Sequence, residues 1–148
     1  MAHTYLYLLF HVVFSTKDRR PYIQEAFEAR VWRYMVGIAD KNNFQIWEAG
    51  GMPDHIHLLM VLPSDMNIAK AVQLVKGGSS KWIRENYSRN FHWQSGYSAF
   101  SVSYSLMQKT KMYIRNQKQH HKKMGFEEEY RLMLQRHGLK YDEQYVFG

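Results

Sequence analysis

The chain has 148 residues, 45% of them hydrophobic. This length predicts one domain whose hydrophobic core is large enough for folding without disulfides or a structural metal. It has no cysteine, which excludes disulfides and thiolate metal sites. The apolar run at residues 5–14 is too short to span a membrane and contains His11, so we expect a cytoplasmic protein without a membrane partner.

The formal net charge of +7 is concentrated in the middle of the chain. Residues 70–123 hold eleven Lys and Arg against one acid, Glu85, whereas both flanking segments are slightly negative. Aromatic residues are interleaved with these charges: Trp82, Tyr87, Phe91, Trp93, Tyr97 and Phe100. Such a field attracts polyanions, and flat rings can stack on unpaired bases, so the segment favours a nucleic-acid partner over a merely solvated basic face.

The first two predicted elements are a strand and a helix. Residues 5–14 are apolar, aromatic and β-branched, which predicts a long strand buried on both faces. A loop at residues 16–21 ends it. Apolar residues then recur at three- and four-residue steps from Ile23, which predicts an amphipathic helix to about Lys41.

A strand pair follows the helix. Residues 44–49 read as a strand, 50–54 as a turn, and 54–60 as a second strand that Pro63 stops. Because the connecting turn is short, we expect this pair to be antiparallel.

The next predicted helix contains two glycines in its middle. Asn67 can cap the helix, which runs to about Ile83. Gly77 and Gly78 weaken it, and they indicate either a close approach of a phosphate or a break into two short helices. Apolar residues do not recur at regular intervals over residues 85–96, so we predict a loop there.

The remaining elements complete a ferredoxin-like order. Residues 100–103 read as a short strand, Ser105 to Gln108 forms a capping-box pattern for a helix at 105–123, and a last helix covers 126–137. We therefore predict one α+β domain over residues 1–148, a split βαβ sandwich. Its antiparallel sheet should carry helices on one face, with C-terminal helices appended.

Four side chains can meet between the second strand of the pair and the helix at 105–123. His55 and His57 alternate with apolar residues and so share one face of the strand. Tyr113 and Gln117 are four apart and share one face of the helix. Together they can form a metal site with a nucleophile, with Asp54 orienting an imidazole. Each also has an ordinary explanation as a core, rim or solvated residue.

The surroundings favour phosphate chemistry. Residues 109–123 contain six basic residues and no acid: Lys109, Lys111, Arg115, Lys118, Lys122 and Lys123. Two imidazoles and an amide are neutral ligands, so they do not reduce the positive charge of a bound divalent ion. The ion can then attract and polarise a phosphate oxygen. A substrate that reaches Tyr113 should therefore be anionic.

These motifs resemble a known family. The histidine motif lies in residues 53–59 (PDHIHLL) and the tyrosine motif in residues 113–117 (YIRNQ). Three further segments match in the same order: HVVFSTK at 11–17, KGGSSKWI at 76–83 and WQSGY at 93–97. Together they resemble the one-tyrosine HUH transposases of the insertion-sequence 200/605 type, including the REP-associated tyrosine transposases.

The resemblance implies a single-stranded DNA transposase. His55, His57 and Gln117 would hold Mg²⁺ or Mn²⁺, and Tyr113 would attack the phosphate to give a 5′-phosphotyrosine and a free 3′-hydroxyl. The partners would be DNA hairpins at the ends of an element and a second copy of the chain, with no small-molecule cofactor beyond the metal. The strand at 5–14 could supply the dimer edge, or be buried within one sheet.

The expected DNA contacts fall in two segments: Lys76, Gly77, Ser79, Ser80, Lys81, Lys109, Arg115 and Lys118. Histidine ligands favour manganese, and His120 or His121 could replace Gln117 as a ligand. Tyr113 needs help to lose its proton, for which the metal or a nearby lysine such as Lys109 is a candidate, but the sequence identifies no general base. Two other functions remain open, a domesticated endonuclease that acts on repeated palindromes and a non-catalytic module that binds single strands.

Overall fold

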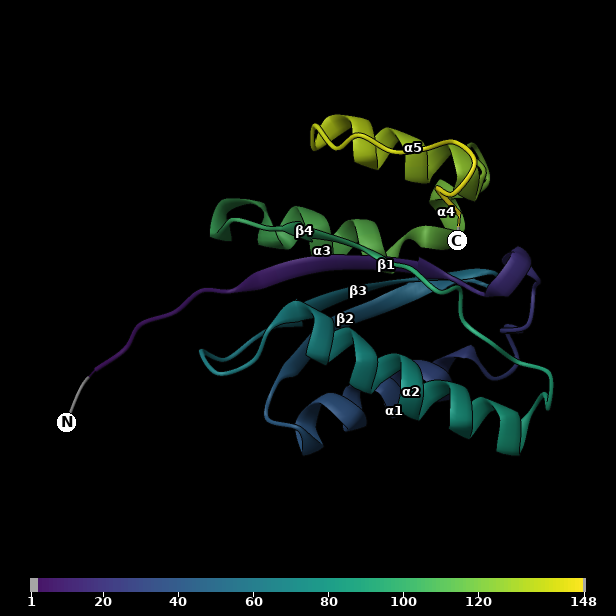
Figure 1. Ribbon diagram of the computed structural model, residues 1–148, viewed down its shortest axis with the longest axis horizontal. Coiled ribbons are helices and arrows are strands. Elements are labelled where there is room, and N and C mark those ends of the chain that lie inside the picture. The colour runs from purple at the N-terminus through teal and green to yellow at the C-terminus, as the bar shows by residue number, and fades with distance from the viewer. Residues whose placement is uncertain (1–2, 148) are drawn as a thin grey trace.

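A computed structural model describes residues 3–147 (Figure 1). Its four strands are β1 (Leu9–Ser15), β2 (Gln45–Met52), β3 (His55–Val61) and β4 (Ser98–Ser101). They form one antiparallel sheet in the order β2-β3-β1-β4. The helices are α1 (Glu28–Lys41), α2 (Ile68–Asn86), α3 (Met107–Arg115), α4 (Gln117–His120) and α5 (Phe126–Arg136), with short 3₁₀ turns at Lys17–Arg19 and Tyr104–Leu106.

The predicted ferredoxin-like fold is confirmed, but helices cover both faces of the sheet and not one, because the appended C-terminal helices pack on the second face (Figure 1). Helices α1 and α2 cover one face over the main core, to which β3 contributes Ile56, Leu58 and Met60. On the opposite face α3 packs through Ile114 on Leu59, and α5 packs on Val13 of β1. Among residues 3–147 no helix has both the length and the apolar composition that a membrane crossing needs.

Strand β1 is shorter than predicted. It begins at Leu9, and Tyr5 is 90% exposed in an extended segment ahead of the sheet. The neighbouring strands end opposite this point, at Val61 and Ser101, and the last backbone bond on this side runs from the Leu62 amide to the Leu8 carbonyl at 3.0 Å. Since β1 lies between β3 and β4, residues 9–14 are buried within one sheet and offer no dimer edge, whereas a dimer contact at residues 5–8 stays a prediction.

Strand β2 extends through two glycines that were predicted to form a turn. The turn is confined to Pro53 and Asp54. A Cβ atom on Gly50 would overlap the carbonyl oxygen of Ile114 in α3. A glycine is therefore needed here, because the backbone of the helix that carries Tyr113 passes directly over β2.

We expect Gly50→Ala to destabilise the fold by about 1–3 kcal/mol, because a backbone carbonyl cannot move aside as a side-chain end can. Thermal and urea unfolding measure the change. Gly77→Ala is the control: it lies in α2, and the added methyl group would meet no atom within 4 Å, so it should stabilise the helix by about 0.5–1 kcal/mol. Equal stability of the two variants would contradict this explanation of Gly50.

Helix α2 is continuous, so a break at the two glycines is excluded. Asn67 caps it as predicted, accepting a hydrogen bond from the Lys70 amide at 2.8 Å. A Cβ atom on Gly78 would lie 2.7 Å from Cδ1 of Ile38 in α1. Gly78 thus allows the two helices to pack closely, and a phosphate contact at Gly77 stays a prediction.

The C-terminal elements differ from the predicted ones in detail. Strand β4 lies two residues earlier than expected, at Ser98–Ser101. The capping box is wrong: α3 starts after a 3₁₀ turn, and no side chain caps it. The helix expected at 105–123 is divided at Asn116 into α3 and α4.

Most of the interleaved aromatic residues are used in packing. Phe91, Trp93 and Phe100 are buried in the core clusters, so they offer no stacking surface to bases. Trp82 stacks on Tyr34 of α1 at 4.7 Å between ring centroids. The proposed stacking platform is therefore wrong for most of its members.

Candidate functional site

Strand β3 presents its two histidines to the α3 side of the sheet, as alternation predicted. Both His55 and His57 are fully buried. The residues between and after them, Ile56 and Leu58, enter the core on the other side. The two imidazole rings lie 5.3 Å apart between centroids, so their ring nitrogens can act on the same atom.

Each imidazole is oriented through its Nδ1 atom. His55 Nδ1 lies 2.8 Å from Asp54 Oδ1, which confirms the predicted role of Asp54. His57 Nδ1 lies 2.8 Å from Nε2 of His11 on β1, a partner that sequence reasoning missed. Both Nε2 atoms are thereby directed toward α3, α4 and α5, an arrangement typical of imidazoles that bind metals.

Tyr113 and Gln117 reach the same place from α3 and α4. Gln117 Oε1 lies 3.2 Å from His55 Nε2. The Tyr113 ring lies 5.7 Å from the His57 ring, centroid to centroid. The structure thus brings together all four predicted side chains, and it does so within one chain.

A carboxylate that the sequence analysis missed joins them from α5. Glu129 is 2% exposed, and its Oε1 lies 3.0 Å from His57 Nε2. Its Oε2 accepts a hydrogen bond from the Tyr113 hydroxyl. A signal was present in the sequence, because Glu129 shares the apolar face of α5 with Phe126 and Met133.

His121 also enters the site, whereas His120 lies at its rim. His121 Nε2 lies 3.0 Å from Gln117 Oε1, and His120 Nε2 lies 3.2 Å from the Tyr113 hydroxyl. One ligand atom each from His55, His57, His121 and Glu129 falls within 4.8 Å of all the others. Imidazole nitrogens and a carboxylate oxygen suit a divalent transition metal, so the donor set fits a metal ion.

Burial sets the protonation of the site. It lowers the pKa of His57 to about 4, against the opposing effect of Glu129, and it holds the pKa of His11 well below its usual value. Burial alone would raise the pKa of Glu129, but hydrogen bonds from His121 and His57 keep it well below its usual value. Neutral imidazoles and an ionised carboxylate are the forms that bind metals.

The phenol of Tyr113 is protonated in this environment. Burial, followed by the negative charge of Glu129, raises the pKa of Tyr113 above its ordinary value. Attack by this hydroxyl therefore requires an acceptor for its proton, and the acceptor in contact with it is Glu129 Oε2.

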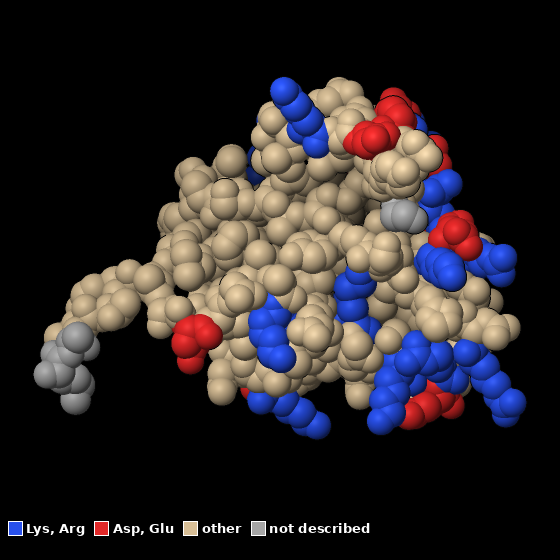
Figure 2. All heavy atoms as spheres, in the orientation of Figure 1, with Lys and Arg blue, Asp and Glu red and all other residues tan. Residues whose placement is uncertain are grey.

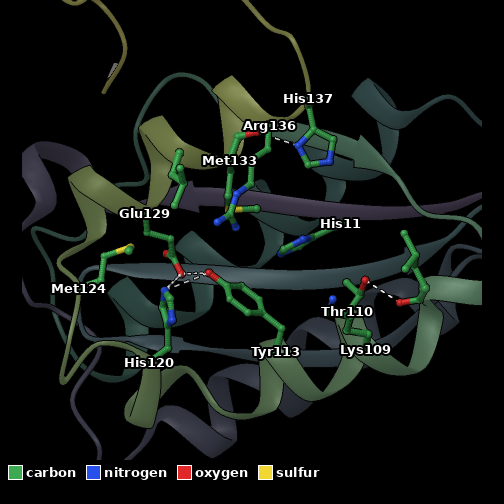
Figure 3. A pocket seen from close by; sticks show the side chains of 12 residues that line it. His11, Lys109, Thr110, Tyr113, His120, Met124, Glu129, Met133, Arg136 and His137 are labelled. Atoms are coloured by element: carbon green, nitrogen blue, oxygen red, sulfur yellow. Dashed lines mark hydrogen bonds and ion pairs between the residues drawn. The ribbon is translucent and has the colours of Figure 1, made fainter.

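A pocket of about 340 Å³ opens beside Tyr113 (Figure 3). Lys109 and Thr110 of α3 line one side, and Arg136 of α5 lies across from them. Apolar side chains, among them Leu132 and Met133, complete the walls. The pocket is cationic and partly apolar, which suits a nucleotide, and it gives the phenol an open route to a substrate.

The predicted DNA contacts are spread over several surfaces. Lys109 lies in the pocket, but Arg115 pairs with Glu48 at 2.7 Å and Lys118 pairs with Glu28 at 2.7 Å. Both pairs join the tyrosine region to other elements of the fold.

The predicted contacts at 76–81 lie on α2, across the sheet from Tyr113 (Figure 1). Lys76 donates to the carbonyls of Gln94 and Gly96, and buried Ser79 accepts from the Trp93 indole. Ser80 bonds to Gly77 within the helix, and Lys81 is exposed. Basic side chains gather over this helix layer, at the bottom of Figure 2.

Fold and site together define a ferredoxin-like protein whose histidine pair faces a tyrosine helix. Comparison with known families agrees: residues 4–117 match the family of IS200-like transposases. The chain belongs to this family.

Its relatives include the transposases for insertion sequence element IS200 of Salmonella typhimurium and Salmonella typhi. Each is 29% identical over 125 residues, which cover 79% of this chain and 81% of the relative.

Two solved structures share the fold. One is a Deinococcus radiodurans protein described as a transposase, with a TM-score of 0.63 and 22% identity over 79% of this chain and 96% of that chain. The other is a REP-associated tyrosine transposase bound to a REP hairpin, with a TM-score of 0.58 and 15% identity over 78% of this chain and 72% of that chain.

Proposed function

We propose that this protein cleaves and rejoins single-stranded DNA at the ends of an insertion sequence. The observation that carries the proposal is the meeting of a phenol, two oriented imidazoles and an amide within one chain. A protein that only binds single-stranded DNA does not require a buried histidine cluster beside a tyrosine that lines an open pocket.

In the proposed reaction the Tyr113 oxygen attacks phosphorus and a 5′-phosphotyrosine forms. The bond from phosphorus to the 3′-oxygen breaks, and that oxygen leaves with the electron pair and takes up a proton as a 3′-hydroxyl. The phenol proton has an acceptor in place at Glu129 Oε2. Rejoining is the reverse attack by a 3′-hydroxyl on the phosphotyrosine, and it needs no external energy source.

His55, His57 and Gln117 would hold the divalent cation, which would supply positive charge to a bound phosphate. Histidine nitrogens in the donor set favour Mn²⁺ over Mg²⁺. This preference supports manganese as the first ion to test.

The proposed substrate is a DNA hairpin with a single-stranded flank. The relative bound to a REP hairpin supports it, as do the cationic pocket beside Tyr113 and the net charge of the chain. One tyrosine holds one cut strand at a time, so an exchange of two ends calls for two copies. We infer that the protein acts as a homodimer, although each site is assembled within one chain.

A cleavage assay tests the proposal. The protein is incubated with Mn²⁺ and labelled single-stranded oligonucleotides from the flanks of its own gene. We expect a protein–DNA adduct that survives denaturant and a released strand with a free 3′-hydroxyl. Binding without an adduct, by folded protein on every flank, would instead support a non-catalytic module.

Lys109 tests the proposed DNA path. Lys109→Ala should reduce the dependence of the single-strand association constant on salt by about 0.7 in the slope of log K against log salt concentration, the loss of one phosphate contact. Lys41→Ala, an exposed lysine at the end of α1, is the control and should leave the slope unchanged. If the wild type and Lys109→Ala have equal slopes, Lys109 makes no phosphate contact and the DNA does not pass along this side of the pocket.

A further inference from the structure

Glu129 is a buried carboxylate that comes from outside the segment matching the family. The match ends at residue 117, whereas Glu129 lies on α5. A buried charge is costly unless other groups compensate it. The position of Glu129 therefore needs a functional or structural explanation.

Its two oxygen atoms have different surroundings. Oε1 faces imidazoles only, at 3.0 Å from His57 Nε2, 3.2 Å from His121 Nε2 and 3.5 Å from His55 Nε2. Oε2 accepts from the Tyr113 hydroxyl and from Gln117 Nε2, the latter at 3.3 Å. His120 Nε2 also lies 3.1 Å from Oε2. Oε1 thus faces the buried imidazoles, and Oε2 faces the Tyr113 hydroxyl and the side chains around it.

The contacts of His55 indicate a cation. The Asp54 carboxylate can only accept at Nδ1, so in the neutral ring Nδ1 carries the hydrogen and Nε2 carries a lone pair. That lone pair faces Gln117 Oε1 at 3.2 Å and Glu129 Oε1 at 3.5 Å.

The amide of Gln117 cannot turn to relieve this arrangement without losing contacts. Its Nε2 is engaged with Glu129 Oε2 and the Tyr113 carbonyl, so Oε1 is the atom that faces His55. His121 Nε2 can donate to Gln117 Oε1 or Glu129 Oε1, at 3.0 and 3.2 Å, but the lone pair of His55 Nε2 still faces two oxygen atoms that only accept. These electron-rich atoms repel one another, whereas a divalent cation would bind all three.

We propose that Glu129 is a metal ligand supplied by the C-terminal helix, through Oε1, and that Oε2 positions the Tyr113 hydroxyl beside the ion. This inference rests on the proposed function, because it concerns the same site. It adds a negatively charged ligand to a set that is otherwise neutral. A carboxylate strengthens binding of hard divalent ions, and the helix α5 becomes part of the active site.

The test measures Mn²⁺ binding directly, with no DNA present. Free Mn²⁺ gives a paramagnetic resonance signal that is lost on binding, so titration of the full chain yields a dissociation constant. We expect Glu129→Gln to weaken Mn²⁺ binding at least about tenfold. Glu128→Gln makes the same charge change on the exposed face of the same helix and should bind like the wild type.

A third variant separates this inference from the proposed function. If His57→Gln weakens Mn²⁺ binding and Glu129→Gln does not, the inference is wrong and the histidine site stands. If neither weakens it, or the wild type binds no Mn²⁺, the metal site itself is wrong. If Glu129→Gln cleaves faster and binds Mn²⁺ with unchanged affinity, the Glu129 carboxylate inhibits cleavage by competing with the substrate phosphate, and its proposed role as a ligand is wrong. Circular dichroism and melting temperatures establish that each variant is folded.

Discussion

Replacing Tyr113 by phenylalanine is expected to abolish strand cleavage while leaving DNA binding intact. The change removes one oxygen, the atom proposed to bond to phosphorus, and the two side chains that contact this oxygen, His120 and Glu129, carry no hydroxyl. Loss of a covalent nucleophile commonly costs at least about a thousandfold in rate. The covalent adduct should disappear entirely.

The measurement is a single-turnover cleavage assay with Mn²⁺, combined with a binding titration of the same oligonucleotide. Tyr104→Phe is the matched control, since Tyr104 is 74% exposed and lies outside the pocket. It should cleave at the wild-type rate. An adduct of normal yield from Tyr113→Phe would show that another residue is the nucleophile.

The second large effect is expected from the histidine pair. His57→Gln should lower the cleavage rate at least about a hundredfold at limiting Mn²⁺, because a metal ligand contributes more than the groups that merely orient ligands, whose loss costs about 10- to 100-fold. The variant also loses the buried contacts of His57 with His11 and Glu129, so a lower melting temperature is expected.

Cleavage rate against Mn²⁺ concentration separates the two effects. A weaker metal site shifts the curve to higher concentration, whereas partial unfolding lowers its plateau. His92→Gln, an exposed loop histidine outside the histidine cluster, should leave both unchanged. The metal account fails if His57→Gln responds to Mn²⁺ as the wild type does.

The features that could be predicted from the sequence are the local ones. Strand alternation places His55 and His57 on one face whatever the rest of the chain does, and a spacing of four brings Tyr113 near Gln117 even across the interruption at Asn116. The order of elements was enough to indicate the ferredoxin-like sheet.

The missed residues depend on contacts between distant parts of the chain. Glu129 is 72 residues from His57, and His11 is 46 residues from it. The spacing of residues within one helix or strand predicts neither contact, because each contact depends on which strands and helices pack together in the fold. The same holds for Gly50, whose role is visible only when α3 lies over β2.

The basic middle of the chain shows the limit of composition as a guide. Its charge did favour a nucleic-acid partner, yet Lys118 and Arg115 are engaged in ion pairs and Lys76 holds a loop. Its aromatic residues mostly build the core. Total charge therefore says what the protein attracts, while the structure is needed to say where.

The central claim is that one phosphodiester can contact both the Tyr113 oxygen and a metal held by His55 and His57. Its most direct test is a crystal structure of Tyr113→Phe with Mn²⁺ and an uncleaved hairpin oligonucleotide, with the ion located by anomalous scattering. We predict the ion at the Nε2 atoms of both histidines, and a phosphate between it and the ring of residue 113. An ion or a scissile phosphate bound elsewhere would contradict the account.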